Sequence, residues 1–582
     1  MNPKIMLLFS VTIFLLAACS SAPVPQVTYD PATLRFDGQR AYAIENEFVT
    51  KFTHRVSGSE QTRLASEWLQ EQFAGYGLTC QTDEWTVINY SRPTPLHNVV
   101  CRLPGDSPQE IVLVAHHDIA STTIEGADND GSGIAILLHL AEIFAAEGKP
   151  PYTLVFVASD GEEYGMLGTG RYIETHPNPK NIIAAFILDN LGAYYYDAMN
   201  METIGQYRRF TPLWLTLLAR ESAHAGNGLW QVNLPSPIDQ ITGQGVPVSF
   251  MDQGPLVAAG VPALGFAGHK PAEKSEEHYA GWHTPKDNME SQSPGALGQS
   301  GLVAEASVRQ LLSMQTFPQE SGPYLYFDGS QQVLRGLPLW LIFIGFVALF
   351  FLGSFLTGRA PFSEKWKSWK TVLPHFLSLW LPLVAFVIML YLFVETGLLL
   401  KFYRYPATTK DPYLTQPNWL IFTLALVGLV VLLFLGHWIA QHFARSSQQP
   451  PFEVIKSFAL FVIGLAAVYV VALNPFSLLF LVPLLFWFLI AGRRGLGMIL
   501  DIVFFVLGGL MLYALIYMFG FLTLRYNFAF LWMLMNMLAD QMVSFPSMVV
   551  IAAIIAAGLS MVVNPPIKAT EKSAEAVSTA SA

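Results

Sequence analysis

The hydrophobic pattern divides the 582-residue chain into two regions of different character. From residue 27 to about 325, short apolar runs alternate with amphipathic segments, turns and mixed charges, whereas residues 337–563 are almost continuously apolar. A periodic pattern of the first kind is typical of a soluble domain, and long apolar segments are typical of a membrane-embedded one. We therefore expect a folded domain at 27–325 and a helical membrane domain at 337–563.

Within the first region, consecutive apolar residues predict strands near 98–103, 111–117, 152–158, 182–188 and 261–267. Helices are predicted at 59–74, where Leu64, Trp68, Leu69 and Phe73 share one face, and at 132–147 and 211–224. Strands that are apolar on both faces belong to a covered sheet. The sequence therefore predicts an α/β fold, a three-layer sandwich with a mostly parallel central sheet.

The apolar region contains several segments near the length of about 20 residues that a helix needs to cross a bilayer. Seven candidate spans are predicted: 337–357, 376–394, 419–438, 455–473, 475–492, 498–521 and 546–563. With seven spans, most basic loops fall on one side, which the positive-inside rule assigns to the cytoplasm. The loop with Lys401, Arg404 and Lys410 is the exception. The 27–325 domain is then expected on the opposite side of the membrane.

The first 19 residues have the pattern of a targeting segment, with Lys4 before the short apolar run 5–16. The run ends in LLAAC and resembles a bacterial lipoprotein signal, which implies cleavage and lipidation at Cys19. A plain secretory signal or an uncleaved anchor are the alternatives. The lipoprotein signal and the alternatives both direct the 27–325 domain out of the cytoplasm. Together with the apolar region, the segment predicts a multi-pass protein of a bacterial cell membrane. The small-residue tail at 564–582 is expected to be disordered.

Composition excludes some classes of function. The formal net charge of −10 and the lack of a basic patch give no reason to expect a nucleic-acid partner. Besides Cys19 the chain has only Cys80 and Cys101, so a cysteine-ligated zinc site is excluded by number. These two residues form either a disulfide or two buried thiols, and the sequence leaves both open.

Polar side chains follow the ends of the predicted strands. They are His116, His117 and Asp118 after 111–115, Glu162 and Glu163 after 152–158, Asp189 after 182–188, His283 and Asp287 in GWHTPKDN, and the loop GADNDGSG at 126–133. Because chemistry collects at the carboxyl ends of parallel strands, we expect these groups to converge. Histidine and carboxylate are the ligands of a catalytic zinc ion, so the sequence predicts a metal site.

The residue types suggest distinct roles. Neighbouring residues point in different directions, so one of Glu162 and Glu163 can bind metal while the other takes a proton from metal-bound water. Asp118 can hold the His116 imidazole in its ligating tautomer. Asp287 either repeats that arrangement with His283 or caps a turn.

The ordered motifs HHD, GADNDGSG, SDGEEYGMLGTG, FILDN and GWHTPKD together resemble the M28 metallopeptidases, aminopeptidases with two zinc ions. The resemblance covers roughly residues 40 to 310 and implies the zinc-aminopeptidase fold. It implies that His116 and Asp189 hold one zinc, that Glu163 and His283 hold the other, that Glu162 is the general base, and that Asp118 orients His116.

The chain departs from the family pattern at two positions. The bridging aspartate of the family falls on Asn129, whose neutral oxygen is a poor bridge between two cations. Asp128 or Asp130 could replace it as a metal ligand; otherwise the site holds one tight ion and one weak one. In FMDQGPLVAAGVPAL, Gln253 stands where the family often has histidine, while Asp252 is retained.

These observations favour a membrane-tethered, zinc-dependent aminopeptidase that removes N-terminal residues from peptides outside the cytoplasm. Two zinc ions are expected, the second at the site that Asn129 alters. One alternative is a glutaminyl-peptide cyclase of the same fold, which LDNLGA and Trp282 also resemble. Another is a catalytically degenerate peptide-binding or sensor protein. Peptide substrates and membrane lipid are the expected partners, and the sequence does not identify which proteins, if any, the chain binds.

Overall fold

The computed structural model describes residues 20–22, 24–89, 92–206, 209–226, 228–319, 322–356, 362–399, 417–443, 450–491, 503, 529–539 and 544–563. The chain forms two compact units, one ending at Leu339 and the other beginning at Trp340. The predicted signal segment and the predicted disordered tail lie outside the described residues.

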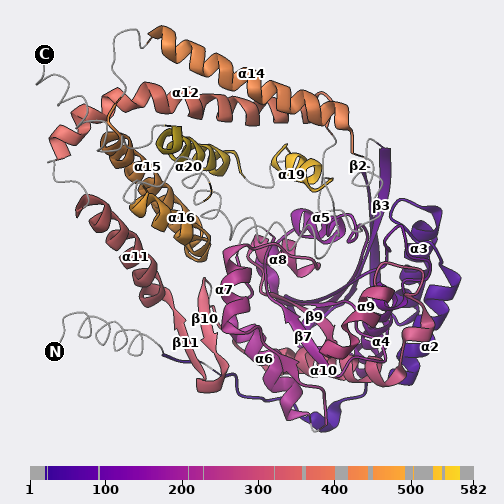
Figure 1. Ribbon diagram of the computed structural model, residues 1–582. Coiled ribbons are helices and arrows are strands. Elements are labelled where there is room, and N and C mark those ends of the chain that lie inside the picture. Colours follow the sequence, from indigo (N-terminus) through magenta and orange to yellow (C-terminus); the bar gives the residue numbers. More distant parts are fainter. Residues whose placement is uncertain are drawn as a thin grey trace, which may run out of the picture. The chain divides into compact units, whose positions relative to one another are not determined.

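An eight-stranded sheet forms the centre of the first unit (Figure 1). Its order is β2 (Thr79–Asn89), β3 (Arg92–Leu103), β5 (Tyr152–Ser159), β4 (Ser107–His116), β6 (Ile182–Leu188), β9 (Ala263–His269), β7 (Ala198–Glu202) and β8 (Val232–Asn233). β4 pairs in parallel with β5 and β6, and β6 pairs in parallel with β9. The outer pairs β2–β3, β3–β5 and β7–β9 are antiparallel. The predicted parallel centre is therefore confirmed.

Helices cover both faces of this sheet, which confirms the three-layer architecture (Figure 1). One face carries α3 (Glu60–Gly75), α4 (Ser132–Glu147) and α6 (Leu213–Ala225), with α2 (Gly38–Lys51) and α10 (Pro294–Ser313) packed beyond them; the other carries α5 (Leu167–Thr175) and α8 (Gln253–Ala259). Side chains along β4 point alternately to the two faces of the sheet and so enter two separate hydrophobic cores. Ile111 and Leu113 enter the core beneath α4, whereas Val112 and Val114 enter the core beneath α8.

The two cysteines left open by the sequence form a disulfide, Cys80–Cys101. They are directly paired across the antiparallel strands β2 and β3. Cys101 is fully buried in the larger core, so the link joins the edge of the sheet to its packed interior.

A small second sheet precedes the apolar region, formed by β1 (Ser20–Ser21), β10 (Tyr324–Phe327) and β11 (Gln332–Arg335). The outer edge of β10 is closed by two side chains of α7 (Pro237–Gly245) rather than by a strand. Gln240 accepts from the Tyr326 N–H at 2.8 Å and donates to its carbonyl at 3.0 Å. Gln244 makes the same pair of bonds with Tyr324, at 3.4 and 2.7 Å. These bonds attach the β10–β11 hairpin to the domain just before α11 begins at Gly336.

The second unit is helical. Its described helices are α11 (Gly336–Leu356, which starts at the end of the first unit), α12 (Phe362–Glu395), α14 (Trp419–Phe443), α15 (Phe452–Leu473), α16 (Leu478–Ile490), α19 (Ala529–Ala539) and α20 (Phe545–Val563). Among the described residues, four segments are long and apolar enough to cross a membrane: Ser368–Glu395, Trp419–Ile439, Phe452–Leu473 and Phe545–Val563. Shorter apolar helices cover Gly336–Leu352 and Pro475–Leu489, and the predicted span 498–521 falls almost wholly outside the described residues.

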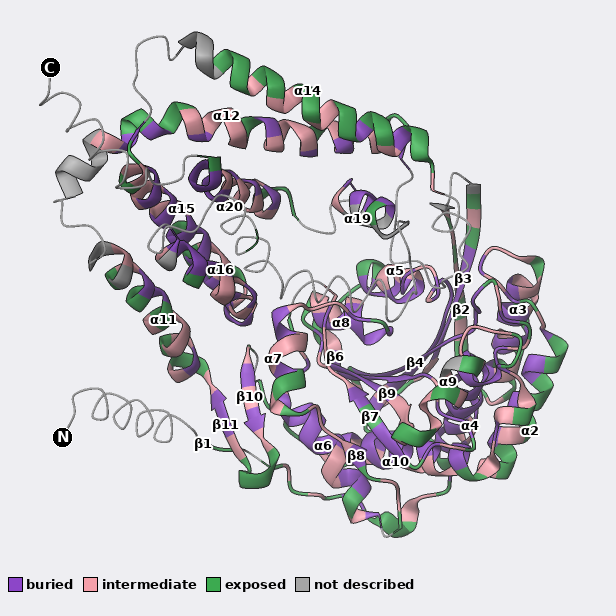
Figure 2. Ribbon diagram, in the orientation of Figure 1, coloured by how far each residue is buried: buried purple, intermediate pink, exposed green. Residues whose placement is uncertain are grey.

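Figure 2 shows exposed residues along the long helices. Many of these residues are apolar, as a lipid-facing surface requires. On α14, Leu420 is 68% exposed and Phe434 is 66% exposed. Apolar patches of this kind are rare on water-soluble surfaces. Four apolar helices with such faces indicate association with a membrane.

The glutamine contacts of α7 predict the stability of the hairpin. Replacing Gln240 and Gln244 together with alanine removes four hydrogen bonds to β10, each contributing about 1 kcal/mol. We expect trypsin to cut after Arg335 roughly tenfold faster or more in the double variant, because cleavage follows local opening. Thr242→Ala on the same helix is the control. Equal cleavage rates in the double variant and the parent would contradict this account.

Candidate active site

The strand order brings the predicted site residues to one edge of the sheet. β5, β4 and β6 are neighbours, and their carboxyl ends lead into Glu162, His116 and Asp189 respectively. The loop Ala127–Gly131 lies directly before α4, the helix that packs across these same three strands. The convergence expected from the sequence is therefore present in the fold.

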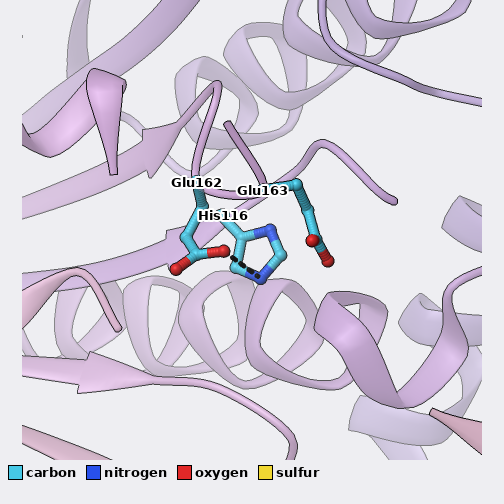
Figure 3. A group of neighbouring side chains, drawn as sticks. All are labelled: His116, Glu162 and Glu163. Atoms are coloured by element: carbon cyan, nitrogen blue, oxygen red, sulfur yellow. Dashed lines mark ion pairs between the residues drawn. The ribbon is translucent and has the colours of Figure 1, made fainter. Parts of the chain in front are cut away.

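Two groups of buried potential ligands share His116. One group consists of His116, Glu162 and Glu163, and the other consists of His116, Asp130 and Asp189. Figure 3 shows Glu162 and Glu163 on either side of the imidazole. The His116 Nε2 atom lies 3.9 Å from Glu162 Oε2 and 3.9 Å from Asp189 Oδ1. In each group the ligand atoms lie within 4.8 Å of one another, close enough to surround an ion.

A second histidine, His283, lies beside Glu163. His283 follows α9 (Ser275–Gly281), and its Nε2 lies 3.0 Å from Glu163 Oε1. The family resemblance assigns His116 with Asp189 to one ion and His283 with Glu163 to another. The structure brings both pairs together.

Asn129 lies between the two pairs. Its Oδ1 is 2.9 Å from His116 Nε2, and its Nδ2 is 2.8 Å from Glu163 Oε1 and 3.0 Å from His283 Nε2. The side chain thus occupies the position between the two ligand pairs that the resemblance assigns to the bridging ligand.

The neighbouring aspartates face other partners. Asp128 accepts from the N–H groups of Gly192 and Ala193 and from the Tyr196 hydroxyl. Asp130 accepts from the Gly133 N–H at 2.9 Å and from the His116 N–H at 3.2 Å. Both carboxylates therefore brace the main chain around the site, although Asp130 also lies within reach of an ion beside His116.

Asp118 contacts His116 as the sequence predicts. The His116 Nδ1 atom lies 3.1 Å from the Asp118 carbonyl oxygen and 3.4 Å from its carboxylate. Two acceptors at Nδ1 favour the tautomer with the proton there, which leaves Nε2 available as a ligand. The carboxylate also accepts from the main-chain N–H groups of Glu162 and Glu163, both at 3.1 Å. Asp118 therefore connects the end of β4 to the loop that carries Glu162 and Glu163.

The Asp287 carboxylate binds the main chain of the Asn129 loop. Its two carboxylate oxygens accept from the main-chain N–H groups of Asp128 at 2.7 Å and Asn129 at 3.2 Å. Of the two alternatives from the sequence, the structure favours capping, with Asp287 supporting the loop that carries Asn129.

The site is rich in buried carboxyl groups. Burial raises the pKa of Asp189 to about 6 and that of Asp287 to about 7, in the latter case with help from Asp128. Burial also raises the pKa values of Glu162 and Asp130 well above their ordinary range. Burial lowers the pKa of His116, but the nearby carboxylates of Asp118 and Glu162 outweigh it and raise the pKa overall. Such a site favours a bound cation.

The sequence did not reveal the role of Arg55, which is fully buried. Its Nε donates to the His117 carbonyl at 2.8 Å, its Nη2 to the Gly126 carbonyl at 2.7 Å, and its Nη1 to the Glu125 carbonyl. The guanidinium therefore ties the end of β4 to the start of the Asn129 loop. Burial lowers the pKa of Arg55 to about 10, whereas nearby carboxylates, above all that of Asp287, act to raise it.

The donor set fits zinc. Buried imidazole nitrogens and carboxylate oxygens converge from several elements, and Asp118 fixes the proton of one imidazole on the side away from the centre. Nitrogen and oxygen ligands of this kind are those of catalytic zinc sites.

Comparison with known proteins identifies the domain. Residues 98–308 match the model of peptidase family M28. This segment contains every residue of the candidate site except Arg55. Residues 98–308 form an M28 peptidase domain.

Curated relatives of the M28 domain include a probable zinc metalloprotease of Pyricularia oryzae, 33% identical over 27% of this chain and 36% of that protein. Leucine aminopeptidase 1 of Ajellomyces capsulatus is 27% identical over 26% of this chain and 43% of its own length. The alkaline phosphatase isozyme conversion protein of Escherichia coli is 26% identical over 34% of this chain and 61% of its own. The chain thus spans between about a third and three fifths of these relatives.

Solved structures similar to the M28 domain include a glutaminyl cyclase from Porphyromonas gingivalis, 21% identical over 47% of this chain and 98% of that one. BSAP, a zinc aminopeptidase from Bacillus subtilis, is 14% identical over 48% of this chain and 96% of its own. Both have a TM-score of 0.40, too low to carry a conclusion about function.

The second departure from the family pattern also has a structural account. In the M28 domain Gln253 is buried, and its Nε2 donates to Ser249 Oγ at 2.8 Å. Asp252 accepts from the Ser159 hydroxyl at the end of β5. Both side chains therefore fix the segment before α8.

Arg55 generates a prediction about this domain. In Arg55→Lys, a single ammonium replaces the planar guanidinium that serves three carbonyls, so at least one buried carbonyl loses its partner, at a cost of about 1–3 kcal/mol. We expect faster amide exchange across residues 117–131 and a lower melting temperature. Arg63→Lys, at an exposed arginine paired with Glu60, is the matched control. Unchanged exchange in the Arg55 variant would show that the loop does not depend on Arg55.

Proposed function

We propose that this chain is a membrane-tethered, zinc-dependent aminopeptidase that removes N-terminal residues from peptides outside the cytoplasm. The observation that carries the proposal is the convergence of two histidine–carboxylate pairs, His116 with Asp189 and His283 with Glu163, beside Glu162 in a domain of a peptidase family. The named aminopeptidases among its relatives support cleavage at the N-terminus.

Zinc would be held beside His116 and Asp189. Glu163 and His283 lie on the other side of Asn129, where the family resemblance implies a second ion. When bound, zinc acts as a Lewis acid toward the scissile carbonyl and makes water a better nucleophile at neutral pH.

Glu162 is the proposed general base. It follows β5, and its Oε2 lies 3.9 Å from His116 Nε2, so its carboxylate borders the proposed metal centre. It takes a proton from the attacking water as the water oxygen bonds to the carbonyl carbon. It then gives that proton to the departing nitrogen as the C–N bond breaks. Asp118 keeps Glu162 in place through the Glu162 main-chain N–H.

The tethering part of the proposal rests on the apolar helices and the loop charges. Four segments have the length and composition of membrane spans. With the seven spans expected from the sequence, the positive-inside rule supports an extracytoplasmic position for the M28 domain. The N-terminal lipoprotein-like segment agrees with that orientation.

The proposed role of Glu162 predicts that its replacement greatly slows peptide hydrolysis without affecting zinc binding. Glu162→Gln keeps the shape of the side chain but removes the base, so we expect turnover to fall by about 10²–10⁴-fold. Zinc content, measured by elemental analysis, should stay at the parent value. Glu71→Gln, on the exposed face of α3, is the control for the chemical change. A Glu162 variant that hydrolyses peptides as fast as the parent would contradict the mechanism.

A glutaminyl-peptide cyclase is the second candidate, and Asn129 favours it because cyclization needs no paired metal site. A peptide with N-terminal glutamine separates the candidates by product mass. The aminopeptidase should release free glutamine and shorten the peptide by one residue, whereas a cyclase would release ammonia and leave the length unchanged. An intact peptide that nevertheless binds would indicate a catalytically degenerate binding protein.

A further inference from the structure

The Asn129 carboxamide separates the two ligand pairs chemically. A carboxylate in this position could offer an oxygen to each side. A carboxamide has one oxygen and one amino group, and the amino group is a donor with no lone pair for a cation. Whichever way it is turned, Asn129 can therefore serve an ion on only one side.

The surrounding contacts determine which side that is. Asn129 Nδ2 donates to Glu163 Oε1 at 2.8 Å and lies 3.0 Å from His283 Nε2, which accepts from it in the tautomer with the proton on Nδ1. Its Oδ1 lies 2.9 Å from His116 Nε2, and because that ring nitrogen carries no proton, the two atoms present lone pairs as two ligands of one ion do. The same Oδ1 accepts from Asn190 Nδ2 at 3.5 Å. The reversed amide would set its oxygen against the Glu163 carboxylate and its amino group against the Asn190 amide. The network therefore favours the oxygen on the His116 side.

The adjacent aspartates do not replace the missing bridge. Both Asp128 oxygens accept hydrogen bonds, Oδ1 from the main-chain N–H groups of Gly192 and Ala193 and Oδ2 from the Tyr196 hydroxyl. Asp130 is bound to main-chain N–H groups of Gly133 and His116, and its reach is to His116 and Asp189. Each adds nothing to the pair formed by Glu163 and His283.

We propose that this M28 domain binds one zinc ion, held by His116, Asp189 and the Asn129 oxygen. On the other side, the Asn129 amino group donates to Glu163 and His283 in the place that a second ion would take. The inference rests on the zinc site proposed above and specifies it further. The inference also differs from a single-ion site at Glu163 and His283, because it assigns these two residues to hydrogen bonding rather than to metal.

Metal stoichiometry of the purified full chain in detergent tests the inference, measured by elemental analysis after dialysis against zinc. We expect one ion per chain in the parent, loss of that ion in His116→Ala, and its retention in His283→Ala. Asn129→Asp restores an oxygen on both sides and should bind two ions. Asn181→Asp, the same change at an exposed side-chain pair, should remain at one.

The outcomes separate two kinds of failure. Two ions in the parent, or an Asn129→Asp protein that still binds one, would overturn the single-ion inference while zinc binding stands. An ion lost from His283→Ala but kept by His116→Ala would overturn the assignment of the side. A parent that binds no zinc would overturn the proposed function itself. If Asn129→Asp fails to fold, the two histidine variants still decide the question.

Discussion

The structure of the site depends on one constraint, the burial of many carboxylates at the carboxyl ends of β4, β5 and β6. A buried carboxylate needs a proton, a cation or hydrogen-bond donors to offset lost hydration. The fold supplies each kind of partner. Asp118 and Asp287 are satisfied by main-chain N–H groups, Arg55 lies fully buried among the acids, and the side chains facing the centre are left for a cation. The outer acids thereby shape the loops, and the inner acids are available for chemistry.

Asn129 changes the balance of charge at this centre while contacting both ligand pairs. The amide keeps the contacts to His116 on one side and to Glu163 and His283 on the other. One negative charge is absent compared with a bridging carboxylate, and with it goes much of the attraction for a second dication. The chain therefore combines the scaffold of a paired metal site with hydrogen bonding that suits a single ion.

The sequence predicted the central strands, α3, α4, α6 and the convergence of the site because consecutive apolar residues and polar strand ends are local signals. It did not predict α10, where glycines lower helix propensity. Those glycines admit close neighbours: a Cβ at Gly301 would meet the Phe36 ring at 2.1 Å. Arg55 also went unrecognised, because its three carbonyl partners lie 62–71 residues away in the chain. Likewise, only the fold shows that Asp287 supports the main chain of the Asn129 loop.

The most direct test of the central claim is the position of the metal itself. Anomalous diffraction at the zinc absorption edge, from crystals of the zinc-loaded protein, would locate each ion relative to the side chains. This account predicts one peak within bonding distance of His116 and Asp189, on the oxygen side of Asn129. A peak between Glu163 and His283, alone or as one of a pair, would contradict it.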